Sequence, residues 1–339
     1  MDASQNGSAY GRRFALPSLE ELVASARVVS LPMRTKFRGV TEREALLIEG
    51  PQGYTEWSPF VEYEDEEAAV WLAGAIEYGY SELPKLHTSA IAINATLGAI
   101  KTKHFAEALE PFGKFSTVKL KVAEPGQTIV EDLFRVLRLH EFFPEAKIRI
   151  DANGGYSVQN AIEIAKEIAI AGIDLEYFEQ PVKTIAELAE VKLKLSRIGI
   201  KVAADESVRK VSDPLAVAQA NAADVLVLKA QPLGGISNAL AIAKEAGLPV
   251  TISSALETSV GISMGLHLAA ALDIESFDAG LGTVAMFEDD VCDEPFIAKD
   301  GILEVRRAVP SEAKLEKLKA SAERQEWWTQ RLERCYRLI

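Results

Sequence analysis

Five acid or amine side chains recur at nearly even spacing through the second half of the chain. They lie 24 to 30 residues apart and are Lys121, Asp151, Glu179, Asp205 and Lys229. Each closes a short apolar, strand-like run, in the order TVKLK, KIRID, LEYFE, KVAAD and VLVLK. A barrel of parallel strands gathers its strand ends at one mouth, where catalytic residues are normally found. The spacing therefore predicts three carboxylates held between two amines.

The three acids, Asp151, Glu179 and Asp205, are the predicted metal ligands. A single carboxylate at a strand end most often caps the following helix, and that is the alternative for each acid alone. Three in consecutive units would repel one another strongly at low dielectric, and a hard divalent cation would relieve that repulsion. Oxygen ligands with open positions suit Mg2+, and Mn2+ is the possible substitute.

The two lysines are the predicted groups for proton chemistry. Period-two alternation places Lys119 and Lys121 on one face of their strand, and the apolar face must meet the helix layer, so both lysines should point into the barrel. A lysine pair at a solvated strand edge is the alternative. Lys229 ends a later strand, opposite Lys121 across the metal. Burial and a neighbouring cation would lower a lysine pKa from about 10.4 towards values useful for a base.

Other polar positions near the strand ends are candidates for substrate contacts. Alternation aligns Arg149 and Asn153 with the acid that ends KIRID. In TISSALETSVGI, Ser253 and Ser254 stand where backbone and hydroxyl donors hold an anionic group before a helix N-terminus, although simple helix capping is an equal alternative. The loop AGLGT, which contains Gly282, would let substrate approach the backbone.

The first 90 residues read as a small α+β region. A short helix is predicted over Ser18–Ala26, with Ser18 as its N-cap, followed by the strand-like runs RVVSL, EALLIEG and YTEWSPF. The basic segment Met33–Gly39 (MRTKFRG) is either a lid that attracts an anionic substrate or a solvated loop.

A regular alternation of strands and amphipathic segments begins near Ile91. It predicts a parallel sheet with right-handed crossovers, and eight strands favour a closed barrel over an open sheet. The predicted strands are Ala90–Leu97, Thr117–Val122, Lys147–Asp151, Leu175–Glu179, Lys201–Asp205, Asp224–Lys229, Pro249–Ser254 and Ser276–Gly280. A C-terminal helix is predicted over Ser311–Arg337, with Trp327 and Trp328 docking on the N-terminal region.

Composition limits the classes of partner. The chain has 339 residues, 48% of them hydrophobic, and a formal charge of -13. That charge argues against binding of nucleic acid or an anionic membrane surface. The two cysteines, Cys292 and Cys335, form no motif, so we expect a reduced, cytoplasmic protein. The sequence does not fix the oligomeric state.

The constellation of Lys-x-Lys at residues 119–121 with Asp151, Glu179, Asp205 and Lys229 resembles the enolase superfamily, muconate-lactonising subgroup. Within this subgroup, the chain is most similar to the o-succinylbenzoate synthase branch of actinobacterial type. The similarity is carried by strings such as KLKVAEPGQT, RIDANGGYS, AADES and LKAQPLGG. The resemblance implies an α/β fold, a modified (β/α)7β barrel over residues 91–283. It also implies an N-terminal α+β capping domain over residues 1–90, completed by residues 284–339.

The same resemblance implies a reaction, dehydration of 2-succinyl-6-hydroxy-2,4-cyclohexadiene-1-carboxylate to o-succinylbenzoate in menaquinone synthesis. It implies that Mg2+ on the three acids binds the substrate carboxylate. Lys121 takes the α-proton and then protonates the departing hydroxyl in a syn elimination. Lys229 stabilises the enediolate from the other face. The implied substrate contacts are Lys119, Arg149, Asn153, Ser253, Ser254 and Gly282.

Two other functions remain open. An N-acylamino acid racemase of the same subgroup would need the same metal and both lysines. A non-catalytic barrel that only binds ligand would be expected to have lost a metal ligand or a lysine, and the chain retains all five residues.

Overall fold

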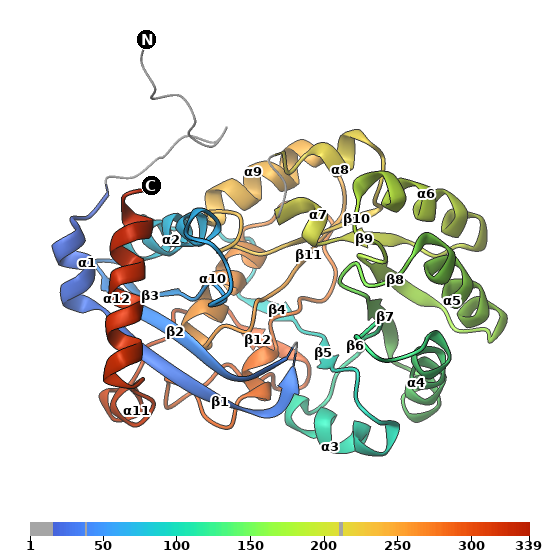
Figure 1. Cartoon of the computed structure of the whole chain (residues 1–339), viewed down its shortest axis with the longest axis horizontal. Helices are drawn as coiled ribbons and strands as arrows, with labels where there is room; N and C mark the ends of the chain where they lie inside the picture. The colour runs from blue at the N-terminus through green and yellow to red at the C-terminus, as the bar shows by residue number, and fades with distance from the viewer. Residues whose placement is uncertain (1–15, 38, 210–212) are drawn as a thin grey trace, which may run out of the picture.

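The computed structural model describes residues 16–37, 39–209 and 213–339 of the chain (Figure 1). A three-stranded antiparallel sheet and its helices stand beside a curled parallel sheet that is surrounded by helices. The first part contains α1 (Leu19–Ser25), β1 (Arg27–Phe37), β2 (Val40–Gly50), β3 (Gly53–Trp57) and α2 (Asp65–Tyr80). The strand and helix order predicted for this part is therefore confirmed.

The start of the N-terminal part follows its local sequence. Ser18 caps α1, and a capping box is completed by the Glu21 side chain, which accepts a hydrogen bond from the Ser18 backbone. The segment Met33–Gly39 is predicted as a lid or a solvated loop, but β1 runs on to Phe37 and pairs there with β2. Arg38 lies outside the described residues, as do the side chains of residues 35–37, so a lid role for this segment stays a prediction.

Seven parallel strands form the second sheet, in the order β11-β10-β9-β8-β7-β6-β5. Sequential neighbours pair because each strand is followed by a crossover that returns the chain to the same end of the sheet. The strands are β5 (Ala95–Leu97), β6 (Thr117–Lys121), β7 (Lys147–Asp151), β8 (Leu175–Glu179), β9 (Val202–Ala204), β10 (Val225–Leu228) and β11 (Val250–Ile252).

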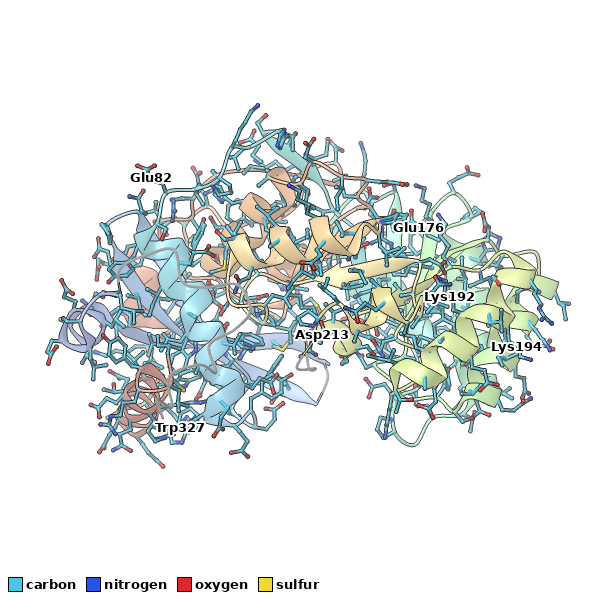
Figure 2. The ribbon with its side chains drawn as sticks, turned by 90° about the horizontal axis from the view of Figure 1, so that it is seen from above. Glu82, Glu176, Lys192, Lys194, Asp213 and Trp327 are labelled. Carbon is cyan, nitrogen blue, oxygen red and sulfur yellow. The ribbon has the colours of Figure 1, made fainter. Side chains whose placement is uncertain are left out.

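Helices cover the outside of this curled sheet (Figure 1). The longer ones are α4 (Ile129–Phe142), α5 (Val158–Ile170), α6 (Ile185–Leu195), α9 (Ile236–Ala246) and α10 (Ser259–Ala270). The short ones are α3 (Phe105–Leu109), α7 (Glu206–Arg209), α8 (Ala216–Gln219) and the 3-10 turns η1 (Thr102–His104), η2 (Glu110–Phe112), η3 (Ser196–Ile198) and η4 (Thr283–Met286). Lys194 of α6 lies on the outer side of this layer, whereas Lys192 is bonded to the carbonyl of Ala223 before β10 (Figure 2).

The segment Ser276–Gly280, predicted as the eighth strand, joins the two edges of the sheet without forming a regular strand. Isolated parallel bridges link it to β11 on one side and to Ile93, just before β5, on the other. Asn94 donates its backbone N–H to the carbonyl of Ala279 at 3.0 Å, while Gly280 donates to Ile252 at 2.8 Å. The curled sheet therefore meets itself through this segment, in agreement with the predicted barrel.

The strand predicted over Ala90–Leu97 is in fact two strands. Its first half is β4 (Ala90–Ala92), which pairs in antiparallel fashion with β12 (Ile302–Glu304), outside the parallel sheet. Its second half is β5. The division follows from two sets of backbone partners, because Ile93 donates to Gly301 while the next residues join the barrel.

The predicted C-terminal helix over Ser311–Arg337 is also divided, into α11 (Glu312–Lys317) and α12 (Ala322–Tyr336). The residues between them pair with the edge of β1, since Ser30 donates to the carbonyl of Leu318 at 2.8 Å and Ala320 donates to Val28 at 3.0 Å. A continuous helix would leave these groups of β1 without those partners.

Helix α12 docks on the N-terminal part, as predicted from its tryptophans (Figure 1). Trp328 is fully buried, its ring meets that of Trp57 edge to face at 5.3 Å, and its Nε1 donates to Glu44 at 2.8 Å. Trp327 lies on the more open side of the helix (Figure 2). Among the described residues, no helix has the length and apolar character that a membrane crossing requires.

Candidate active site

The ends of β6, β7 and β8 bring three predicted site residues into register. Lys121 lies opposite Asp151 in the β6–β7 pair, and Asp151 lies opposite Glu179 in the β7–β8 pair. Asp205 and Lys229 come directly after β9 and β10. All five side chains are buried, with Asp151 and Glu179 fully enclosed. The parallel sheet therefore gathers the predicted residues at its carboxyl end, as the spacing indicated.

Lys119 bridges two of the buried carboxylates. Its Nζ lies 3.0 and 3.1 Å from the two oxygens of Glu179 and 3.3 Å from Oδ2 of Asp151. The lysine was predicted to contact substrate; it lines the pocket and also contacts two predicted metal ligands, so a substrate contact stays a prediction. One positive group thus already lies between Asp151 and Glu179.

Lys121 is fixed beside the same aspartate. Its Nζ donates to Oδ2 of Asp151 and, at 2.7 Å, to Oδ1 of Asn153. The backbone N–H of Asn153 in turn donates to Asp151 Oδ1 at 3.0 Å. Asn153 has a φ of +45°, a left-handed conformation that asparagine tolerates better than most residues. The turn after β7 therefore fixes the direction of the Lys121 amine.

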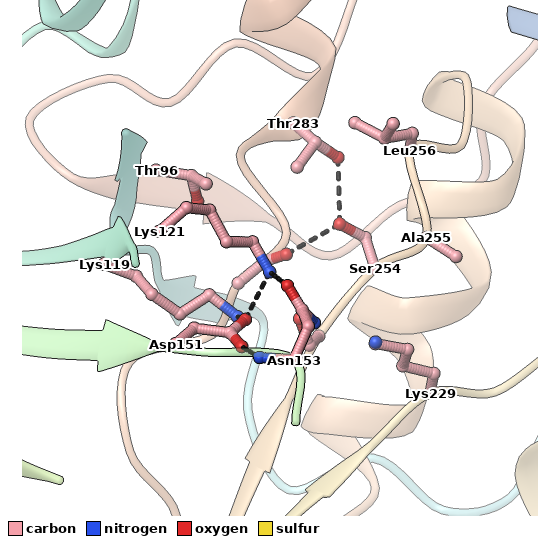
Figure 3. Close-up of a pocket in the computed structure, with 12 residues that line it drawn as sticks. Thr96, Lys119, Lys121, Asp151, Asn153, Lys229, Ser254, Ala255, Leu256 and Thr283 are labelled. Carbon is pink, nitrogen blue, oxygen red and sulfur yellow. Dashed lines mark hydrogen bonds and ion pairs between the residues drawn. The ribbon is translucent and has the colours of Figure 1, made fainter. Parts of the chain in front are cut away.

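Lys229 approaches the pocket from the side opposite Lys121 (Figure 3). Its Nζ lies 2.6 Å from Oδ2 of Asp205, and the other oxygen of Asp205 accepts from Nε of Arg209 at 3.1 Å. The pocket therefore carries an amine on each of two sides, each held by an aspartate.

Burial and neighbouring charges shift the pKa values of the three acids in different directions. Burial, together with the charge of Asp151, raises the pKa of Glu179 to about 8. Burial also opposes ionisation of Asp151 and Asp205, but Lys121 and Lys119 outweigh it for Asp151, and Lys229 and Arg209 outweigh it for Asp205. The pKa values of both aspartates therefore fall well below their ordinary range.

Lys119 shows the complementary effect. Burial works against its charge, but the carboxylates of Glu179 and Asp151 outweigh burial and raise the pKa of Lys119 above its ordinary value. This lysine therefore stays protonated, so it is suited to electrostatic stabilisation and not to accepting a proton as a base.

The acid side chains point to these amines and to Arg209. Across the described ranges, no three His, Cys, Asp or Glu side chains are arranged as they stand to hold one ion. Asp151 and Glu179 converge on the Lys119 ammonium, whereas both oxygens of Asp205 are directed to Lys229 and Arg209. The metal set of Asp151, Glu179 and Asp205 accordingly stays a prediction.

A pocket opens above these groups. Ser253 and Ser254 line it as predicted, and Ser254 Oγ donates to the carbonyl of Gly280 at 2.8 Å and lies 2.9 Å from Oγ1 of Thr283 (Figure 3). The full lining is Thr96, Lys119, Lys121, Asp151, Asn153, Lys229, Ser253, Ser254, Ala255, Leu256, Gly280 and Thr283. Hydroxyl and ammonium groups on this wall suit an anionic ligand.

Two predicted substrate contacts are placed elsewhere. Arg149 is fully buried and bonded to Glu176 at 2.5 Å, to Asn94 at 2.8 Å and to the carbonyl of Asp278 at 2.7 Å. It does not line the pocket, so its position gives no support to a substrate contact. Gly282 lies between two lining residues of the loop but does not itself face the pocket.

Sequence reasoning missed several residues that line the pocket or hold its charged groups. Thr96 is the middle residue of β5 and has no charge, so neither its position nor its type distinguished it in the sequence. Arg209 stands four residues after Asp205, the spacing of an ion pair on one helical turn. Ala255 and Leu256 carry no such signal, because an apolar residue in a loop has no distinguishing pattern.

A second cavity adjoins the first, with Thr96 in the wall of both. Arg34, Ile100, Phe112 and Met286 are among its lining residues. The pocket above the lysines therefore continues towards β1 and η4.

Two family models match the chain. The model described as enolase C-terminal domain-like matches residues 101–310, and the one described as enolase N-terminal domain-like matches residues 28–79. The o-succinylbenzoate synthase of Mycobacterium tuberculosis is 47% identical over 324 residues, which cover 96% of this chain and 97% of that protein. The o-succinylbenzoate synthase of Mycolicibacterium smegmatis is 45% identical over 96% of this chain and 99% of that protein.

Solved structures show the same fold. A muconate lactonizing enzyme from Pseudomonas fluorescens superposes with a TM-score of 0.74 at 20% identity, covering 87% of this chain and 98% of that chain. The 2-chloromuconate cycloisomerase from Rhodococcus opacus superposes with a TM-score of 0.73 at 22% identity and the same coverage. The predicted arrangement of a barrel with an N-terminal cap is confirmed by this likeness.

Proposed function

The chain belongs to the enolase superfamily, and from this premise we propose that it is an o-succinylbenzoate synthase. The proposed reaction is the syn-dehydration of 2-succinyl-6-hydroxy-2,4-cyclohexadiene-1-carboxylate to o-succinylbenzoate, a lyase reaction of menaquinone synthesis. The observation that carries the proposal is the pair of buried amines, Lys121 and Lys229, on opposite sides of one pocket. Relatives named for this activity match nearly the full chain.

Lys121 is the proposed general base. Its Nζ accepts the proton from the ring carbon that carries the carboxylate, and the electrons of that C–H bond develop as negative charge on the carboxylate. The same Nζ then donates the proton to the departing hydroxyl, the C–O bond breaks, and water leaves an aromatic ring. Asn153 and Asp151 hold this amine in place during both transfers.

Lys229 acts through its charge. Its ammonium lies across the pocket from Lys121, where it stabilises negative charge that develops on the substrate. Asp205 fixes the position of this ammonium, and Arg209 in turn donates to the other oxygen of Asp205. Ser253 and Ser254 would hold a carboxylate of the substrate at the pocket wall.

The proposed cofactor is Mg2+, or Mn2+ in its place, on Asp151, Glu179 and Asp205. The donor set fits a hard cation, because Asp151 and Glu179 already converge on the single positive charge of Lys119. Burial and the charge of Asp151 raise the pKa of Glu179, and a cation bound beside this carboxyl would oppose both effects. When bound, the ion would supply further positive charge for the substrate carboxylate.

The test is consumption of the diene substrate by the purified protein, followed by ultraviolet absorbance with Mg2+ and with chelator. Turnover that stops with chelator and returns with Mg2+ supports the proposal. No turnover with Mg2+ present would contradict it and favour a barrel that only binds ligand.

Racemisation of N-acylamino acids is a second candidate, because the pair of amines that supports dehydration also fits it. Two amines on opposite sides of a pocket allow proton removal from one face of a carbon and return to the other. The same preparation should therefore be assayed for racemisation of N-succinyl amino acids. Racemisation that is faster than dehydration would overturn the first assignment.

We also propose a division of the chain and a cellular location. Residues 1–90 with residues 284–339 would form the capping domain, and residues 91–283 the catalytic barrel. The docking of α12 on the N-terminal sheet supports the assignment of residues 284–339 to the capping domain. Buried Cys292 and Cys335, which form no disulfide, are in keeping with the cytoplasm.

A further inference from the structure

Arg43 of β2 crosses from the N-terminal sheet to the wall of the pocket. Its side chain is 3% exposed, and its guanidinium donates to backbone carbonyls on both sides of the boundary. Nε donates to Leu256 at 3.1 Å, Nη2 donates to Ala255 at 3.3 Å and to Ser58, and Nη1 donates to Glu44 at 3.1 Å. One fixed fork of donors thus joins three separate stretches of backbone.

Two of these carbonyls belong to the pocket. Ala255 and Leu256 line the cavity next to Ser253 and Ser254. Leu256 has a φ of +62°, a conformation that costs a residue with a branched side chain free energy and persists only where the surroundings hold it. The bond from Arg43 to the Leu256 carbonyl is such a restraint.

Glu56 of β3 holds the other end of the same loop. It is fully buried, and its carboxylate accepts hydrogen bonds from the backbone of Thr258 at 3.1 Å and of Gly261 at 3.0 Å, and from Oγ1 of Thr258 at 2.5 Å. A Cβ on Gly261 would come within 2.9 Å of the Glu56 carboxyl carbon, so the fit is close. The pocket wall is therefore fastened at both ends to the N-terminal sheet.

We propose that Arg43 is a positioning residue that sets the pocket wall at Ala255 and Leu256, and thereby the fit of the substrate. The inference rests on the function proposed above. The base and the second pocket amine have other supports, since Lys121 is held by Asp151 and Asn153, and Lys229 by Asp205. Displacement of the wall should therefore weaken substrate binding more than it slows proton transfer.

The test variant is Arg43→Lys, which keeps the charge but replaces the planar fork by one short-reaching ammonium. We expect KM for the diene substrate to rise about tenfold or more, while kcat falls by less than about threefold. The dissociation constant of o-succinylbenzoate, measured by calorimetry, should rise in step with KM.

A matched control is Glu77→Gln. Glu77 of α2 also joins the N-terminal part to the barrel, where its carboxylate accepts from the backbone of Ser237 at 3.1 Å, but it does not line the pocket. We expect this variant to lower the thermal unfolding midpoint with KM changed by less than about twofold. A milder variant, Phe60→Leu, removes the ring that lies 4.3 Å beneath the guanidinium and should raise KM in the same direction.

The outcomes separate the two proposals. An inactive wild-type protein would overturn the proposed function and this inference with it. An active wild-type protein with KM unchanged in Arg43→Lys would overturn this inference alone. The inference would also be overturned if Glu77→Gln raised KM as much as Arg43→Lys does, with a similar loss of stability in the two variants. If Arg43→Lys does not fold, an unchanged KM and product affinity in Phe60→Leu would overturn it instead.

Discussion

Lys119 donates a hydrogen bond to each carboxylate oxygen of Glu179, at 3.0 and 3.1 Å, in the interior of the barrel. Both side chains are buried, so water does not solvate the charge of either one. Replacement of Lys119 by methionine would leave Glu179 and Asp151 close together without this cation. We expect the free energy of unfolding of the metal-free protein to fall by about 3 to 5 kcal/mol at pH 8, measured by denaturant titration.

Lys147→Met is the control for that substitution. Lys147 also pairs with a glutamate, Glu176, at 3.2 Å, but its side chain is 64% exposed. An exposed pair contributes less than about 1 kcal/mol. Equal losses in the two variants would show that the Lys119 pair is not a buried, desolvated contact.

The raised pKa of Glu179 predicts how stability depends on pH. Its folded pKa of about 8 lies above the ordinary value of 4.5, so the folded chain keeps a proton that the unfolded chain releases between these values. Its stabilising contribution is complete below pH 4.5 and is lost as pH rises towards 8. We therefore expect the unfolding midpoint of the chelator-treated protein to fall from pH 6 to pH 8.

The variant Glu179→Gln separates this effect from that of other groups. Burial and the charge of Glu257 raise the pKa of Glu56 to about 7, so Glu56 contributes in the same direction. Glu179→Gln should make the pH dependence shallower without removing it. A slope that is unchanged in Glu179→Gln would mean that Glu179 does not hold the proton.

Period-two alternation and strand spacing were enough to find the five buried acids and amines that follow or end strands β6 to β10. They work because each parallel strand ends at the same rim, so sequence position alone fixes which side chains meet. The same alternation did not show how far below the pocket each inward-facing side chain lies. Arg149 shares a face with Asp151 but lies two residues deeper, where Glu176 and Asn94 bind it below the pocket.

Long-range contacts could not be predicted from local pattern. Arg43 lies 213 residues from Leu256, and no spacing rule connects a strand residue with a carbonyl so distant in sequence. The divided C-terminal helix has the same cause, because its break is set by the edge of β1. Ser321, which caps α12, is a local signal for a new helix, but the pairing of the residues before it with β1 has no local signal.

The two lysines of the pocket should differ in their effect on rate. Lys121→Ala removes the proposed base, and we expect dehydration to fall by about 1,000-fold or more. Lys229→Ala removes a charge that acts on the developing anion, and we expect a loss of about 100-fold. Both rates are measured with the diene substrate and saturating Mg2+. Calorimetric binding of o-succinylbenzoate to each variant checks that the pocket persists, and a fully active Lys121→Ala protein would contradict the assignment.

The contact between Trp328 and Trp57 predicts how strongly α12 stabilises the fold. Trp328 is fully buried and donates to Glu44, so Trp328→Ala should lower the free energy of unfolding by about 3 to 5 kcal/mol. Trp327 is partly exposed beside it, and Trp327→Ala should cost clearly less. Both values come from denaturant titration followed by circular dichroism. Equal losses would indicate that α12 stabilises the protein through its outer face, in conflict with the packing against β3.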